Sequence, residues 1–169
     1  MADKITAKSL LNSKVPPQNP QAESSLIGSL LIDKDAIIKT ADIVHTDDFY
    51  VDKNGLIFDA ILKLFEKREP IDVVTLSEQL DKNGKLKEVG GASYLTELVN
   101  GVPSAAHVVQ YAQIVAQKAT LRRLIEAASQ INAMAYDDEE QLDGLLDKAE
   151  KTLFDVSQKH LRQNFISIK

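Results

Sequence analysis

Residues 15–31, which read VPPQNPQAESSLIGSLL, mark the point at which the chain begins an ordered fold. Each proline fixes its own φ at about −65° and disfavours the α region for the residue before it, so the approach is extended. Asn19 is a good helix N-cap, Pro20 suits the first helical position, and Glu23 lies near the positive end of the helix dipole. The apolar residues form one helical stripe, made of Ala22, Leu26, Ile27, Leu30 and Leu31. Gly28 lies beside this stripe and permits a close approach of another helix.

The composition limits the class of protein. A chain of 169 residues fits one domain, or one domain with an appendage, and can bury about 70% of its unfolded surface without a staple. Cysteine is absent, and the sequence shows neither a signal peptide nor a run of about 20 apolar residues. We therefore expect a cytoplasmic protein that has no membrane partner. The net charge of −5 argues against tight nucleic-acid binding, and the acidic segment 137–150 is interpreted as a solvated helix tip.

Proline and glycine divide the chain in a way that predicts an all-α fold with a compact multi-helix head over residues 15–103. Residues 1–14 are polar and unpatterned and are expected to form a disordered tail. Alternating strand patterns with hairpin turns are missing from the sequence. Capping and stop signals place the helices of the head at about 20–32, 35–44, 54–67, 72–82 and 92–100, and either Asp72 or Thr75 opens the fourth of them.

From Ser104 onward the pattern changes, because neither proline nor glycine appears until Gly144. A helix over residues 105–136 would be roughly 48 Å long at 1.5 Å per residue, so it must extend beyond the head. A turn at residues 137–141 reverses the chain, and a second helix follows to about His160. The head is therefore expected to be followed by a protruding antiparallel helical hairpin over residues 104–161. Residues 162–169 are expected to begin a linker.

The first hairpin helix carries more apolar surface than one neighbouring helix can cover at a crossing of about 20°. Its apolar arc spans about 120° and contains Leu121, Leu124, Ile125, Ala128, Ile131 and Ala135. The return helix has one stripe, made of Leu142, Leu145, Leu146, Ala149, Leu153 and Val156, and Phe154 and Leu161 lie about 100° away from it. Exposed apolar patches usually mark an interface, so we expect a second copy or a partner to cover this surface. The alternative is that the head folds back over the hairpin.

Residues for common enzyme chemistry are missing from the sequence. It contains no GxxxxGK(S/T) loop to hold nucleotide phosphates, no cysteine nucleophile and no nucleophile elbow. The histidines, His45, His107 and His160, have no partners at metal-ligand spacing. His45 with Asp47 and Asp48 could form an acid–base cluster, but capping of the following turn is the interpretation we favour.

Residues 72–80 are similar to the first helix of a helix-turn-helix motif. The next helix of such a motif should carry basic or amide groups for the DNA groove. Residues 92–100 offer Ser93, Tyr94, Thr96 and Glu97 but no lysine or arginine. DNA reading by this element is therefore the less favoured interpretation.

Within residues 15–168, several short motifs follow one another along the chain. They are VPPQNPQAESSLIGSLL at 15–31, DFY at 48–50, IF.AI at 57–61, PID.VTL at 70–76, VGG..YL at 89–95 and PSAA…YA.IV at 103–115. In their order and spacing they resemble the N-terminal domain of DnaB-type bacterial replicative DNA helicases. Each motif is weak alone, and the ordered spacing is the specific feature. His107 replaces the usual asparagine, and Pro20 is an uncommon addition.

The resemblance implies a role without chemistry of its own. In that family the domain precedes a linker and a RecA-like motor that hydrolyses ATP and moves along single-stranded DNA. It therefore implies a non-enzymatic fragment without cofactors, from a parent ATP-dependent DNA helicase that uses ATP and Mg²⁺. Residues 162–169 would lead to the absent motor domain. The domain itself would form a collar whose hairpins pair, giving a hexamer built as a trimer of dimers, and would receive the C-terminal helicase-binding domain of primase.

Candidate interface residues lie on the hairpin and in the head. We expect five hairpin side chains to serve pairing or docking: Leu121, Ile125, Ala128, Ile131 and Phe154. Tyr94 is a further candidate, because exposed tyrosines are common at interface hot spots. No residue is expected to be catalytic or to bind a cofactor or metal. A stand-alone helical adaptor or loader and, with less support, a helix-turn-helix DNA-binding regulator are the alternative functions.

Overall fold

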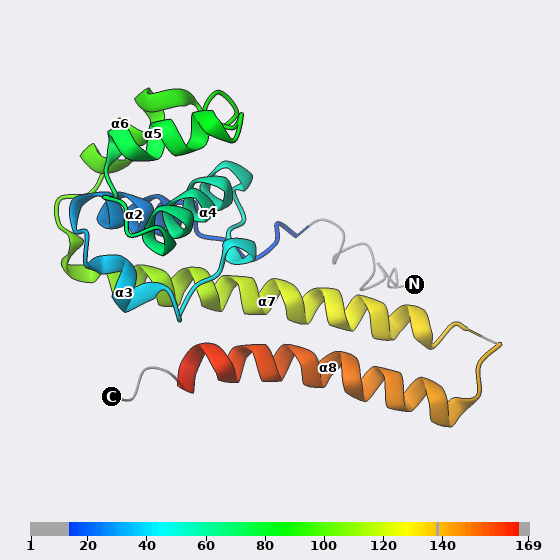
Figure 1. Cartoon of the computed structure of the whole chain (residues 1–169). Helices are drawn as coiled ribbons and strands as arrows, with labels where there is room; N and C mark the ends of the chain where they lie inside the picture. The colour runs from blue at the N-terminus through cyan, green and yellow to red at the C-terminus, as the bar shows by residue number, and fades with distance from the viewer. Residues whose placement is uncertain (1–13, 138, 166–169) are drawn as a thin grey trace, which may run out of the picture.

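The computed structural model describes residues 14–137 and 139–165, and every regular element within them is a helix. A head of short helices lies on one side of a long antiparallel hairpin formed by the last two helices (Figure 1). The elements are α2 (Pro20–Ile32), α3 (Ala36–Thr40), the 3₁₀ turn η1 (Thr46–Asp48), α4 (Asp52–Glu66), α5 (Val73–Lys82), α6 (Gly91–Asn100), the 3₁₀ turn η2 (Ala105–His107), α7 (Val108–Met134) and α8 (Leu142–Phe165). The prediction of an all-α fold is confirmed. Apart from Lys14, the tail expected at residues 1–14 lies outside the described residues.

The helix α2 forms the centre of the head. Its start follows the sequence signal, because the Asn19 side chain accepts a hydrogen bond from the Ala22 N–H at 2.9 Å. The apolar stripe of α2 is buried where the helix packs against α4, α6 and α7. At the crossing with α6, a Cβ on Gly28 would lie 2.2 Å from the Leu98 carbonyl oxygen. Only glycine therefore allows the two helices to approach this closely.

Three helix boundaries differ from the sequence prediction by three residues or more. Helix α3 ends at Thr40 rather than near Val44, because the Thr40 carbonyl accepts the N–H groups of both Ile43 and Val44 and closes a turn. The first hairpin helix starts at Val108 rather than 105, after the turn η2. Helix α8 continues to Phe165 rather than ending near His160, so residues 162–165, where a linker is expected to begin, are helical.

The division between head and hairpin is less sharp than the sequence suggests. The first half of α7 belongs to the core of the head, where Val108, Ala112 and Val115 are buried. The second half extends past the head, with α8 running back beside it (Figure 1). The hairpin therefore protrudes over its distal part only, and its base is shared with the head. None of the described helices is long and apolar enough to cross a membrane.

Candidate functional site

The distal hairpin exposes apolar side chains on the side that faces away from the head. On α7, Leu121, Leu124 and Ile125 are 39%, 44% and 55% exposed. Ala119, about 200° away around the helix from Leu121, is buried against the head. The row of apolar residues on α7 therefore points away from the core.

Helix α8 extends the same surface. Leu142, Leu146 and Leu153 are exposed, whereas Leu145 is half-buried beside α7. Viewed along each helix from its N-terminus, the exposed row lies about 70–100° clockwise from the row that faces the other helix. Because the helices are antiparallel, the two rows open on the same side of the hairpin. We call this surface the hairpin face; it contains Leu121, Leu124, Ile125, Ala128, Leu142, Leu146 and Leu153.

The structure brings some of the residues predicted for an interface together and separates others. Leu121, Ile125 and Ala128 lie on the hairpin face, and Ile131 is half-buried toward α8. Phe154 is 58% exposed, but it lies about 100° around α8 from Leu153, outside that face. It instead lines a hollow of about 480 Å³ together with His45, Asp155, Gln158, Lys159, Arg162 and Gln163.

Tyr94 lies in the head and is half-buried, so the exposure expected from the sequence is wrong. Its hydroxyl donates a hydrogen bond to Asn54 Oδ1 at 2.9 Å, and Lys53 Nζ lies 3.5 Å from the ring centroid. The ring also lines a hollow of about 240 Å³ between α2 and α6, with neighbours that include Gln21, Ser25 and Glu97. Part of Tyr94 therefore remains accessible from that hollow.

Glu23 has a role that the sequence did not reveal. Its carboxylate is 2% exposed and accepts hydrogen bonds from the backbone N–H groups of Tyr50 at 2.7 Å and Val51 at 3.2 Å. It also accepts one from Asn54 Nδ2 at 3.1 Å. Tyr50 and Val51 lie immediately before α4 and Asn54 lies in its first turn, so a residue of α2 fixes the chain where it enters another helix. The sequence showed only its place in the first turn of its own helix.

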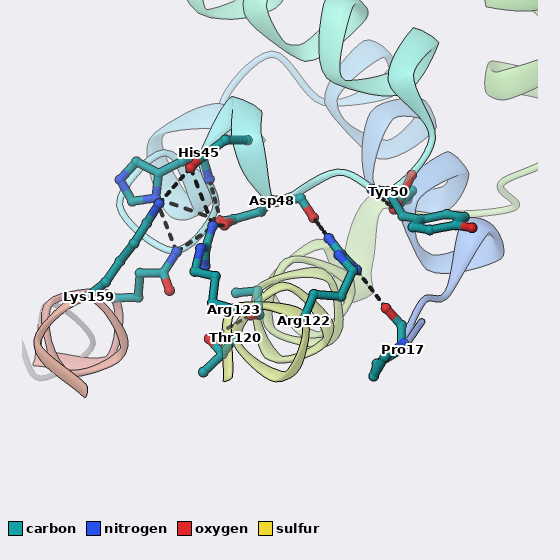
Figure 2. Close-up of polar contacts among 12 residues, drawn as sticks. Pro17, His45, Asp48, Tyr50, Thr120, Arg122, Arg123 and Lys159 are labelled. Atoms are coloured by element: carbon teal, nitrogen blue, oxygen red, sulfur yellow. Dashed lines mark hydrogen bonds and ion pairs between the residues drawn. The ribbon is translucent and has the colours of Figure 1, made fainter. Parts of the chain in front are cut away.

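Asp48 forms the second buried polar centre (Figure 2). Its side chain is fully buried, accepts a hydrogen bond from the His45 N–H at 2.8 Å and pairs with Arg123 of α7. Gln163 Nε2, from the end of α8, donates to Asp48 Oδ2 at 2.9 Å. Asp48 thus closes its own turn by bonding back to His45, whereas the sequence predicted that it would cap the following turn, which it does not. The added partners from α7 and α8 make it the point where head and hairpin meet.

Arg122 holds the entry segment of the head against α7 (Figure 2). Its guanidinium donates to the carbonyl oxygens of Pro17 at 2.7 Å and Asp48 at 2.6 Å. Burial lowers the pKa of Arg122 from its usual value, and the negative charges of Glu23 and Asp48 oppose this shift. The neighbouring arginines of α7 thus fix the η1 turn and the chain that precedes α2.

Asp47, at the rim of this centre, is part of an exposed ion-pair network. Its Oδ2 accepts a hydrogen bond from Lys159 Nζ at 2.7 Å and lies 3.5 Å from Arg123 Nη2. Burial alone would raise the pKa of Asp47, but the Lys159 hydrogen bond and the charges of Lys159 and Arg123 outweigh it. The pKa of Asp47 is therefore below its usual value.

The polar clusters fix the geometry of the fold. Among the residues that the structure describes, no group of three or more His, Cys, Asp or Glu side chains could hold a metal ion. His45 Nδ1 lies 3.1 Å from Gln163 Nε2 and 3.7 Å from Asp48 Oδ2, within the contacts that join the head to α8. The hairpin face is therefore the main candidate for function, followed by the hollow beside Tyr94.

Comparison with known sequences gives consistent matches. The family model described as the DnaB-like helicase N terminal domain matches residues 15–117. The chain is similar to the replicative DNA helicase DnaC of Bacillus subtilis (strain 168), with 40% identity over 160 residues, 95% of this chain and 35% of the relative. It is 39% identical over 160 residues, with the same coverage, to the replicative DNA helicase DnaB of Geobacillus stearothermophilus. The chain thus spans about a third of the length of these relatives.

Solved structures show the same fold. The N-terminal domain of DnaB helicase from Mycobacterium tuberculosis superimposes with a TM-score of 0.80 at 39% identity, covering 83% of this chain and 99% of that one. A DnaB-like replicative helicase, described with its interactions with primase, gives a TM-score of 0.68 at 24% identity. That match covers 82% of this chain and 31% of the other. The N-terminal domain of DnaB helicase from Helicobacter pylori, also described with its interactions with primase, gives 0.62 at 21% identity, covering 79% and 100%.

Proposed function

Because this chain belongs to the family of DnaB-like helicase N-terminal domains, we propose that it is the collar domain of a replicative DNA helicase. The whole protein would be a cytoplasmic, ATP-dependent helicase whose motor domain binds ATP, Mg²⁺ and single-stranded DNA. Support comes from relatives that are named replicative DNA helicases and of which this chain spans about a third. In this proposal the collar contributes assembly and docking rather than catalysis.

Pairing of hairpins is the proposed basis of assembly, and the hairpin face is the observation that carries it. Leucine and isoleucine side chains on this face are 39–68% exposed, although exposing an apolar side chain to water is unfavourable in free energy. A second copy offers the same apolar face, and a two-fold axis would bring the two faces together. Dimers formed in this way would be the units of a hexamer built as a trimer of dimers.

The test is the solution mass of Ile125→Asp, which places a charge in the centre of the hairpin face. We expect the wild-type chain to form a dimer or larger species and the variant to be shifted to the monomer, measured by light scattering after size exclusion. Gln130→Asp is the matched control, because Gln130 is exposed on α7 outside the face. An unchanged mass for a folded Ile125→Asp, with helicity confirmed by circular dichroism, would disprove pairing through this face.

The hollow beside Tyr94 is the proposed docking point for the C-terminal helicase-binding domain of primase. Its lining combines an aromatic ring with the polar groups of Gln21, Ser25 and Glu97, a mixture typical of protein contacts. Two solved relatives are described with their interactions with primase. Calorimetry should show at least tenfold weaker primase binding for Tyr94→Ala, whereas Tyr94→Phe keeps the ring and serves as the control. Equal affinities for all three proteins would exclude this contact.

A stand-alone helical adaptor or loader would use the same surfaces, so the gene distinguishes it from a helicase domain. A GxxxxGK(S/T) motif encoded within about a hundred codons after Lys169 would support the helicase, because that loop holds nucleotide phosphates. A DNA-binding regulator would need a basic recognition helix. Helix α6 instead carries Glu97 and no lysine or arginine.

A further inference from the structure

Helix α8 is attached to the rest of the protein by two different kinds of contact. Among the described elements, it packs closely only against α7, through half-buried residues that include Leu145, Ala149 and Val156. Toward the end of α8, large apolar side chains are not packed against the protein: Phe154 and Leu161 point to solvent and are 58% and 46% exposed. A helix end held by apolar packing would bury these side chains.

Side-chain hydrogen bonds and an ion pair link the end of α8 to the head. Gln163 Nε2 donates to Asp48 Oδ2 at 2.9 Å and lies 3.1 Å from His45 Nδ1. Lys159 Nζ donates to Asp47 Oδ2 at 2.7 Å (Figure 2). We call these four residues, Asp47, Asp48, Lys159 and Gln163, the latch. The head side of the latch is fixed independently of α8, because Arg123 of α7 pairs with Asp48.

The contacts of the latch are incomplete. Gln163 is only 5% exposed, yet its Oε1 is buried and has no hydrogen-bond partner, and the same holds for Arg123 Nη1. A hollow of about 480 Å³, lined by His45 and by residues of α8 that include Lys159 and Gln163, lies beside these contacts. A buried polar atom without a partner opposes docking, since it would be hydrated in the open state. Undocking would therefore sacrifice few apolar contacts and would recover hydration.

We propose that the last two turns of α8, residues 159–165, form a strap that docks onto and leaves the head while α7 and the head stay folded. The latch holds the strap in its docked position. Docking and undocking of the strap change the position of the last described turns of α8 relative to the head. The strap is thus a conformational device at the end of α8.

Hydrogen exchange followed by mass spectrometry on the whole chain tests the strap, because local opening is read out segment by segment. In Gln163→Ala we expect amide exchange at residues 156–165 to be at least tenfold faster than in wild type. Exchange in α7 at residues 108–119 should not change. Ser157→Ala, an exposed position on the same helix, is the matched control and should behave as wild type.

Two results would overturn the strap. One is unchanged exchange at residues 156–165 in Gln163→Ala, and the other is equal acceleration in the strap, α7 and the head, which would indicate a single cooperative unit. If Gln163→Ala does not fold, Lys159→Ala takes its place in the exchange experiment, because it removes only an ion pair at the rim of the latch. Raising salt from 0.1 to 1 M shortens the screening length from about 10 to about 3 Å. It should accelerate exchange of the strap in wild type and have less effect in Lys159→Ala; equal acceleration would count against the latch.

Discussion

Gly28 is the residue on which the packing of α2 against α6 depends. A Cβ at this position would meet the Leu98 carbonyl oxygen at 2.2 Å and Val102 Cγ2 at 2.7 Å. Since the first of these atoms belongs to the backbone, a clash can be relieved only by moving a helix. The distance between α2 and α6 therefore depends on the absence of a side chain at Gly28.

We predict that Gly28→Ala lowers the free energy of unfolding by about 1–3 kcal/mol, the usual cost of overpacking a core. Gly144→Ala is the matched control, because its Cβ would meet only the flexible Glu140 side chain, at 3.4 Å. In α8 that exchange should stabilise the helix by about 0.5–1 kcal/mol. Urea denaturation compares the two, and a loss of stability in neither or in both would contradict the close crossing.

Asp47 gives the protein a pH dependence of known sign. Because its pKa is lowered in the folded state, Asp47 stabilises the fold above its unfolded pKa of about 4. That contribution disappears as the pH falls through the lowered value and the carboxylate takes up a proton. The side chain is 66% exposed, so screening by solvent keeps the effect small.

We therefore expect the free energy of unfolding of wild type to fall more steeply below pH 4 than that of Asp47→Asn. Urea titrations at pH 6, 5, 4 and 3 would measure both slopes. Asp137→Asn is a suitable control, since Asp137 is exposed near the hairpin turn. Parallel curves for wild type and Asp47→Asn would show that the ion pair with Lys159 contributes nothing.

Local capping was the residue-level feature that sequence reasoning found well. Asn19 caps α2 as expected, and of the two candidates Asp72 and Thr75 it is Asp72 that caps α5; its carboxylate accepts the Thr75 N–H at 2.8 Å. Both partners lie three residues away. The partners of Asp48 on α7 and α8 are 75 and 115 residues distant, and those of Glu23 are 27–31 residues distant. No short-range pattern encodes such pairs, so the buried polar centres were missed.

At the level of helices, periodicity predicted that α8 forms but not how it is rotated. The expected inward stripe included Leu142, Leu146 and Leu153, all of which are exposed. The inward row instead continues from Leu145 and Val156 to Gln163. Leu145, Ala149 and Val156 of the expected stripe do face α7, and at the end of the helix Gln163 continues this row by bonding to Asp48, a polar partner that a hydrophobic pattern cannot reveal.

The link between α7 and the η1 turn depends on Arg123. Asp48 has no exposed surface, and Arg123 is its cationic partner at the junction of these elements. We expect Arg123→Ala to lower the free energy of unfolding by about 3–5 kcal/mol, because it leaves a buried carboxylate without its partner. Arg162→Ala, an exposed arginine on α8, should change it little. Thermal and urea denaturation would measure the difference, and similar stabilities would show that Asp48 does not depend on this pair.

For the whole molecule, charge predicts weak contact with nucleic acid. The net charge of −5 repels phosphate, and the exposed apolar face offers few cations. We expect no binding of a fluorescent single-stranded oligonucleotide at micromolar protein and about 0.15 M salt, measured by anisotropy. A basic single-strand binding protein serves as the positive control. Saturable, salt-sensitive binding would show that the collar itself contacts DNA.

The bond between Arg122 and the Pro17 carbonyl joins positions 105 residues apart, which has a consequence for synthesis of the chain. A ribosome adds about 5–20 residues per second, so Arg122 emerges roughly 5–20 s after Pro17. Throughout that interval the side of α2 that later packs on α7 has no partner. Among the described helices, the first to be made is thus one of the last to be fully buried. During synthesis, α2 is therefore the segment whose exposed apolar side a ribosome-associated chaperone would contact.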